Sequence, residues 1–84
     1  MDINLRHLAV NDQAVISRIT APGEMGRRIR DMGLVPSTRI QVIGRAPLRD
    51  PVALRVQDAT ITLRNNEADH IQVIREADGE AREV

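Results

Sequence analysis

The sequence contains no phenylalanine, tyrosine or tryptophan, and it contains no cysteine. The missing thiols exclude disulfides, thiolate metal sites and a cysteine nucleophile. The missing rings exclude the base stacking on which binders of single-stranded nucleic acid depend. They also exclude the aromatic groove with which SH3 signalling domains bind polyproline. Any hydrophobic core must therefore be built from aliphatic side chains.

Net charge is absent as well, because twelve basic residues balance twelve acidic residues. A neutral chain has no overall field that would attract nucleic acid or an anionic membrane. No stretch approaches the ~18 consecutive apolar residues of a membrane span, and the first ten residues do not resemble a signal peptide. We therefore expect one small cytoplasmic domain that binds no nucleic acid and does not insert into the membrane.

Short apolar runs with a period of two dominate the rest of the sequence. Runs rich in β-branched residues and bounded by turn residues are typical of strands. Five such runs are found, at residues 14–19, 39–45, 52–56, 60–64 and 70–74. The three residues between Val56 and Thr60 predict a tight hairpin with Asp58 in a left-handed conformation. The pattern predicts a mainly β protein, a small and strongly bent antiparallel barrel of about five strands.

One segment has the helical period instead. Met25, Ile29 and Met32 are spaced i, i+4 and i+7, which places them on one face of a short helix. Pro22 suits the first helical positions, and Gly33 suits the position just after the helix. We expect this single inserted helix to close one end of the barrel.

Two shorter features follow. A helical turn is predicted at residues 65–69, capped by Asn65 or Asn66, with Ala68 facing inward. The apolar period ends after Ile74, so residues 1–75 are predicted to form the domain and residues 76–84 a disordered acidic tail.

The outer face of the predicted inserted helix is rich in arginine. Because the apolar stripe faces inward, Arg27, Arg28 and Arg30 should point outward. Glu24–Arg28 and Arg27–Asp31 have i,i+4 spacing, which stabilises a helix by only ~0.2–0.5 kcal/mol for each pair. From the residues alone, a solvated helix face is the more common explanation for such arginines.

Candidate catalytic and metal-binding residues are few. His7 and His70 are far apart in the sequence, and a specific metal site needs several converging ligands. Ser17 and Ser37 have no neighbouring histidine, and Asp50 precedes a proline, as turn-initiating residues often do. We predict no bound metal, no cofactor and no enzyme activity.

Three motifs together resemble the FeoA family, small SH3-like domains that accompany the ferrous-iron transporter FeoB. The motifs are R-x-R-D-M-G-L-x-P at 28–36, A-P-x-x-D-P-V at 46–52 and L-R-x-x-E-A at 63–68. The resemblance extends from residue 5 to residue 74. The same domain type is found at the C-terminus of metal-dependent repressors of the DtxR kind.

Family members usually have glycine at four positions where this sequence has Asn11, Ser37, Arg49 and Asp58. Asparagine and aspartate adopt positive φ readily, whereas serine and arginine do so at a cost of roughly 1–2 kcal/mol. We therefore expect altered turns at Ser37 and at Arg49.

The resemblance implies a protein partner. It favours a small accessory protein that docks on the cytoplasmic GTPase region of an FeoB-type transporter and modulates iron uptake, as a monomer or a weak oligomer. Residues expected to bind the partner are Arg27, Arg28 and Arg30, together with Leu48 and Arg49 of a loop beside the helix. The alternative is a stand-alone relative of the repressor domain. A chain of this length has no room for a helix-turn-helix, so that relative would act through protein–protein contacts.

Overall fold

The computed structural model describes residues 2–45 and 50–76. These residues form six strands, two α-helices and one 3-10 helix, η1. In chain order the elements are β1 (Asp2–Asn4), η1 (Leu5–His7), β2 (Gln13–Ile19), α1 (Gly23–Asp31), β3 (Arg39–Arg45), β4 (Val52–Val56), β5 (Ala59–Leu63), α2 (Asn65–Ala68) and β6 (Ile71–Arg75).

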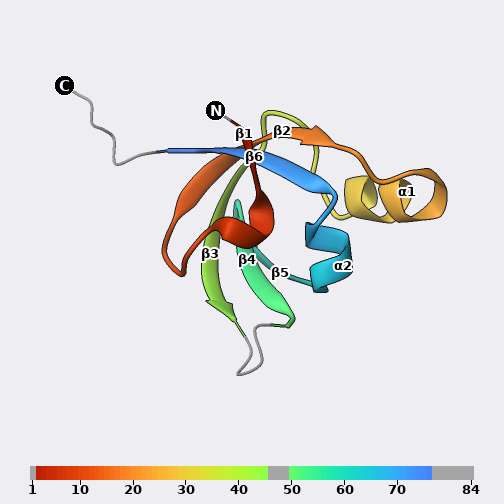
Figure 1. Cartoon of the computed structure of the whole chain (residues 1–84). Helices are drawn as coiled ribbons and strands as arrows, with labels where there is room; N and C mark the ends of the chain where they lie inside the picture. Colours follow the sequence, from red (N-terminus) through yellow and green to blue (C-terminus); the bar gives the residue numbers. More distant parts are fainter. Residues whose placement is uncertain (1, 46–49, 77–84) are drawn as a thin grey trace.

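The six strands form one antiparallel sheet with the order β1-β6-β2-β3-β4-β5. Figure 1 shows the sheet bent around a central space, with α1 projecting beyond it. The predicted mainly β class with one inserted helix is confirmed, and all five predicted strands are present.

The prediction missed β1 and η1. The three residues of β1 are Asp, Ile and Asn, too few to show an apolar period. They form a strand because they pair with β6, where Asp2 lies opposite Ile74 and Asn4 opposite Gln72. Long-range pairing of this kind has no local signal in the sequence.

Fifteen aliphatic residues of the described part of the chain form the buried core. The inward positions of the strands are those that the alternation predicted, such as Ile40 and Val42 on β3 and Ile71 and Val73 on β6. Ala68 of α2 is fully buried, as expected. A core of aliphatic side chains alone therefore fills the bent sheet.

The end of α1 is set by Gly33, which has a φ of +91°. The Gly33 N–H donates to the Arg30 carbonyl (2.9 Å), and the Leu34 N–H donates to the Ile29 carbonyl (3.3 Å). These two bonds are those of a Schellman motif, and the buried side chains of Ile29 and Leu34 supply its hydrophobic contact. The predicted helix end is confirmed, while Pro22 is the N-cap rather than the first helical residue.

Two local predictions were wrong. In the β4–β5 hairpin Gln57, not Asp58, has positive φ (+56°), which is the geometry of the first residue in a type II′ turn. The N-cap of α2 is Arg64, not an asparagine. The reason is that Glu67, the third residue of the helix, accepts the backbone N–H of Arg64 (3.0 Å). This hydrogen bond is one half of a capping box, and it makes Arg64 the N-cap residue.

The expectation of an altered turn at Ser37 was also wrong. Ser37 keeps the positive φ (+81°) that a glycine would adopt, and Asn11 has the same value. The Ser37 N–H donates to the Ile16 carbonyl (2.7 Å), so pairing with β2 holds this backbone in place. Arg49 lies outside the described residues.

Glu76, the first residue of the predicted tail, is held against the sheet. Its N–H donates to the Gln13 carbonyl (2.8 Å), and its carboxylate accepts from Arg39 Nε (2.9 Å). Residues 77–84 lie outside the described residues, so the predicted tail stays a prediction. Within residues 2–45 and 50–76, neither α-helix is long and apolar enough to cross a membrane.

Candidate partner-binding surface

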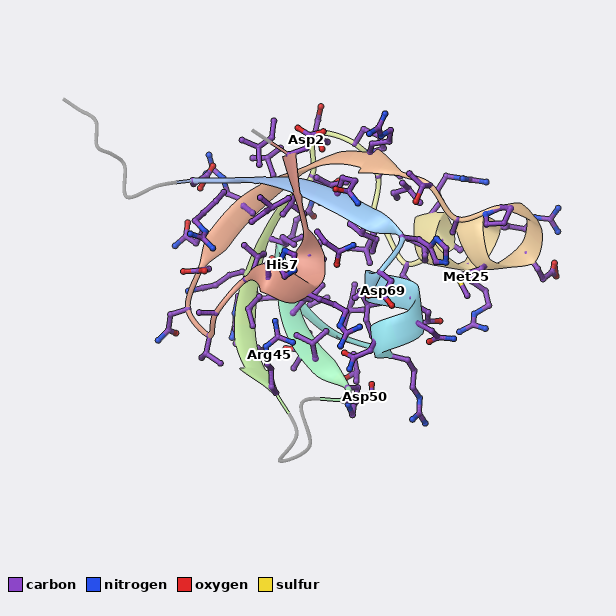
Figure 2. All side chains as sticks on the ribbon, viewed as in Figure 1. Asp2, His7, Met25, Arg45, Asp50 and Asp69 are labelled. Atoms are coloured by element: carbon purple, nitrogen blue, oxygen red, sulfur yellow. The ribbon has the colours of Figure 1, made fainter. Side chains whose placement is uncertain are left out.

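The arginines of α1 lie on its outer face, because the helix is anchored by its other side. Ile29 is fully buried, and Met25 and Met32 are partly buried against the core. Figure 2 shows Met25 on the side of α1 that faces α2. Arg27 and Arg30 are exposed. A helix anchored by Ile29 therefore presents cations to solvent on its other side.

Arg28 differs from its two neighbours because it already has a partner within the chain. Its guanidinium forms an ion pair and a hydrogen bond with Glu67 Oε2 of α2. Glu67 is 5% exposed and also accepts the N–H of Arg64 through Oε1. In the described part of the chain Arg28 does not form the predicted ion pair with Glu24, since Glu67 takes its place. Arg28 therefore links α1 to α2.

Arg27 and Arg30 are engaged far more weakly. Arg27 Nη1 is 3.9 Å from Glu24 Oε1, at i,i+3 rather than the predicted i,i+4 to Asp31, and both side chains are at least 70% exposed. Such a surface pair contributes ~0–1 kcal/mol. Within the described part of the chain Arg30 forms no ion pair. Both guanidiniums can therefore meet carboxylates of another molecule.

The close packing at the start of α1 depends on Gly26. A Cβ on this residue would lie 2.4 Å from the Ala21 carbonyl oxygen, which is backbone and cannot rotate away. The same Cβ position is 3.3 Å from Nη1 of Arg30. The helix can therefore lie close to the chain that leads into it, with Arg30 folded over the contact.

The loop with Leu48 and Arg49 lies outside the described residues, so both remain predicted partner-binding residues. Its described flanks are Arg45 and Asp50. Figure 2 shows both on the other side of α2 from Met25. The expectation that the loop lies beside the helix concerns residues outside the described ranges, so it stays a prediction.

Among residues 2–45 and 50–76, no group of three or more histidine, cysteine, aspartate or glutamate side chains lies close enough together to hold a metal ion. Figure 2 shows His7 on η1 and Asp69 after α2 in the same region. The Asp69 carboxylate, however, forms an ion pair with Arg6 at 3.0 Å. The prediction that no metal is bound stays a prediction.

The chain belongs to the FeoA domain family, whose model matches residues 3–75. It is 42% identical over 71 residues to an Fe(2+) transport protein A/Fe(2+) transporter FeoB fusion protein of Porphyromonas gingivalis, and the match spans 84% of this chain and 8% of that one. The chain thus corresponds to a small part of that relative. It is also similar to the solution structure of an FeoA-like protein of Clostridium acetobutylicum, with a TM-score of 0.85 and 30% identity over 99% of this chain and 96% of that one.

A likeness of fold extends to repressors. A manganese-dependent transcriptional repressor superposes with a TM-score of 0.80 at 23% identity, covering 88% of this chain and 41% of the repressor. Identity at this level shows a shared fold alone. The predicted SH3-like antiparallel class is confirmed, with six strands in place of about five.

Proposed function

We propose that this chain is a cytoplasmic, non-enzymatic accessory protein of ferrous iron transport, which docks on the cytoplasmic GTPase region of an FeoB-type transporter and modulates uptake. The observation that carries the proposal is the fused relative, in which an FeoA part and an FeoB part share one polypeptide. A covalent link holds two modules at high effective concentration. An FeoA domain that is not fused to FeoB would reach the same association through a docking surface.

The exposed face of α1 is the surface that suits this docking best. Arg27 and Arg30 are presented by a helix whose opposite side is anchored by Ile29, so little backbone conformational entropy is lost when they bind. Arginine forms planar, bidentate pairs with carboxylates and is enriched in protein interfaces. Arg28 is a poorer candidate than the sequence suggested, because binding a partner would compete with buried Glu67.

The test compares two charge-reversal variants. Arg27→Glu/Arg30→Glu changes the proposed face, whereas Arg18→Glu/Arg64→Glu makes the same change in net charge at exposed arginines elsewhere. Binding of each folded variant to the purified cytoplasmic domain of an FeoB-type transporter is measured at low and high salt. We expect the α1 variant to bind at least about tenfold more weakly at low salt, with a smaller difference at high salt.

Equal affinities for the two variants would refute the α1 face. Failure of the wild-type chain to bind at all would refute docking itself. A pull-down from native membranes adds an independent outcome, since recovery of a DNA-binding repressor in place of a membrane GTPase would favour the repressor-domain alternative.

A further inference from the structure

An open groove of about 510 Å3 crosses the outer face of the sheet, over β2, β3 and β4. The loop before β3 and the turn after β4 form its ends. The polar residues that line it include Gln13, Ser37, Arg39, Gln41, Arg55 and Gln57. Its size lies within the ~300–1,000 Å3 of ligand pockets, but such pockets are enclosed. This groove is open, and its lining combines apolar groups with amides and guanidiniums, so an extended chain segment suits it better than a small molecule.

Three of these residues form a row across the strands. Gln41 lies opposite Gln13 on β2 and opposite Arg55 on β4. Directly paired side chains share one face of a sheet, about 5 Å apart, so the row spans ~10 Å, the length of three extended residues. Each glutamine carries both a carbonyl acceptor and an NH2 donor. The row can therefore bond the donors and acceptors of an extended backbone.

The charge of the groove is positive and only partly balanced. None of the residues that line it is acidic. Arg39 is paired with Glu76, with Nη2 and Oε2 2.9 Å apart. Arg55 is exposed and forms no ion pair with any residue that the structure describes. One guanidinium beside a row of amides is suited to receive a carboxylate, which it can bind in bidentate fashion.

Backbone strain is concentrated at the same place. In the described part of the chain three non-glycine residues have positive φ, namely Asn11, Ser37 and Gln57. Asparagine adopts this conformation readily, whereas serine and glutamine do not. Both of the strained residues line the groove, where glycine would relieve the strain but would remove a polar side chain. Strain retained in this way is typical of binding sites.

We propose that this groove binds an extended protein segment rich in aspartate or glutamate. Arg55 receives a side-chain carboxylate, and Gln13, Gln41 and Gln57 bond the backbone of the segment. A nucleic acid strand would fit less well, because it needs more cations and aromatic platforms than this groove offers. The surface differs from the face of α1, so the proposal holds or fails independently of docking through Arg27 and Arg30.

The probe for the test is an acetylated and amidated octapeptide in which glutamate alternates with threonine. The matched control peptide has glutamine in place of each glutamate. Each is titrated into the 15N-labelled full chain at low salt, and the backbone amide signals are followed. We expect the acidic peptide to shift the signals of Gln13, Ser37, Gln41 and Gln57, and the control peptide to shift none of them.

Two variants sharpen the result. Arg55→Gln should weaken binding of the acidic peptide about tenfold or more, since a hydrogen bond to a charged group is lost. Arg64→Gln makes the same change in net charge at an exposed arginine elsewhere and should leave binding unchanged. The spectrum of each variant verifies its fold. Equal responses to both peptides, shifts centred on α1, or an unaffected Arg55→Gln would overturn the proposal.

Other occupants give distinct results. A variant truncated after Glu76 tests whether the chain's own acidic residues 77–84 occupy the groove. If the truncated variant binds the acidic peptide and the full chain does not, those residues are the occupant, and the proposal falls. If the groove signals move with protein concentration and without peptide, a second copy of the chain is the occupant, and the proposal falls as well.

Discussion

Removal of the Arg28 guanidinium should destabilise the protein, because it leaves a buried carboxylate without its cation. The Glu67 side chain is 6% exposed, and two donors satisfy it, the Arg64 N–H and Arg28. Breaking a fully buried pair costs about 3–5 kcal/mol. The Arg28 side chain, however, is 68% exposed, so water can partly replace it, and the cost should be nearer to the ~1–3 kcal/mol of an unsatisfied buried group.

The comparison uses the variants Arg28→Ala and Arg27→Ala. The two substitutions are at neighbouring positions of one helix, and each makes the same change in helix propensity. Arg27 has only a distant, exposed partner, so its replacement should change stability by less than about 0.5 kcal/mol. In a domain of this size each kcal/mol shifts the melting temperature by roughly 4–8 °C. Unfolding is followed by far-ultraviolet circular dichroism, because the chain has no tryptophan or tyrosine to report by fluorescence.

A second substitution tests the cause. Glu67→Gln removes the buried charge while its amide oxygen can still accept the Arg64 N–H. Added to Arg28→Ala, it should therefore recover part of the lost stability, so that the double variant melts above the Arg28→Ala single variant. Equal melting temperatures for Arg28→Ala and Arg27→Ala, or a double variant less stable than Arg28→Ala, would refute the reasoning.

Three further predictions concern the helix contact, the core and metal binding. Gly26→Ala should lower the urea midpoint of unfolding, although alanine has the better helix propensity, because its Cβ would meet the Ala21 carbonyl at 2.4 Å. We expect the free energy of unfolding to fall by about 1–3 kcal/mol, and a higher midpoint would contradict the close contact. Ile29→Ala and Leu63→Ala remove side chains with no exposed surface and should each cost ~2–5 kcal/mol, whereas a melting temperature lowered by one or two degrees would show that these sites are not tightly packed. Anaerobic calorimetry with Fe²⁺ should detect no stoichiometric micromolar binding. If such binding is detected and is lost when either histidine is replaced by alanine, the chain has a metal site that the sequence did not predict.

Local chemistry in the sequence determined most of the secondary structure. Alternating apolar residues place the five longer strands, since each strand needs one face for the core. The helix has its own stop signal at Gly33, because only a residue that tolerates positive φ can form the Schellman motif there. The burial of Ile29 follows from the same helical spacing. These features depend on neighbours within a few residues, and so they can be predicted from the chain alone.

The tertiary structure decided which of the three clustered arginines is held by a buried carboxylate within the chain. Arg28 could not be distinguished from Arg27 and Arg30 by sequence, because its partner, Glu67, lies thirty-nine residues away along the chain. Glu67 itself carries one local signal, its place three residues after the N-cap, but its burial depends on how α2 packs in the tertiary structure, where it contacts η1. The groove is likewise a tertiary feature. Gln13, Gln41 and Arg55 lie on three strands, and only the register of the sheet brings them into one row.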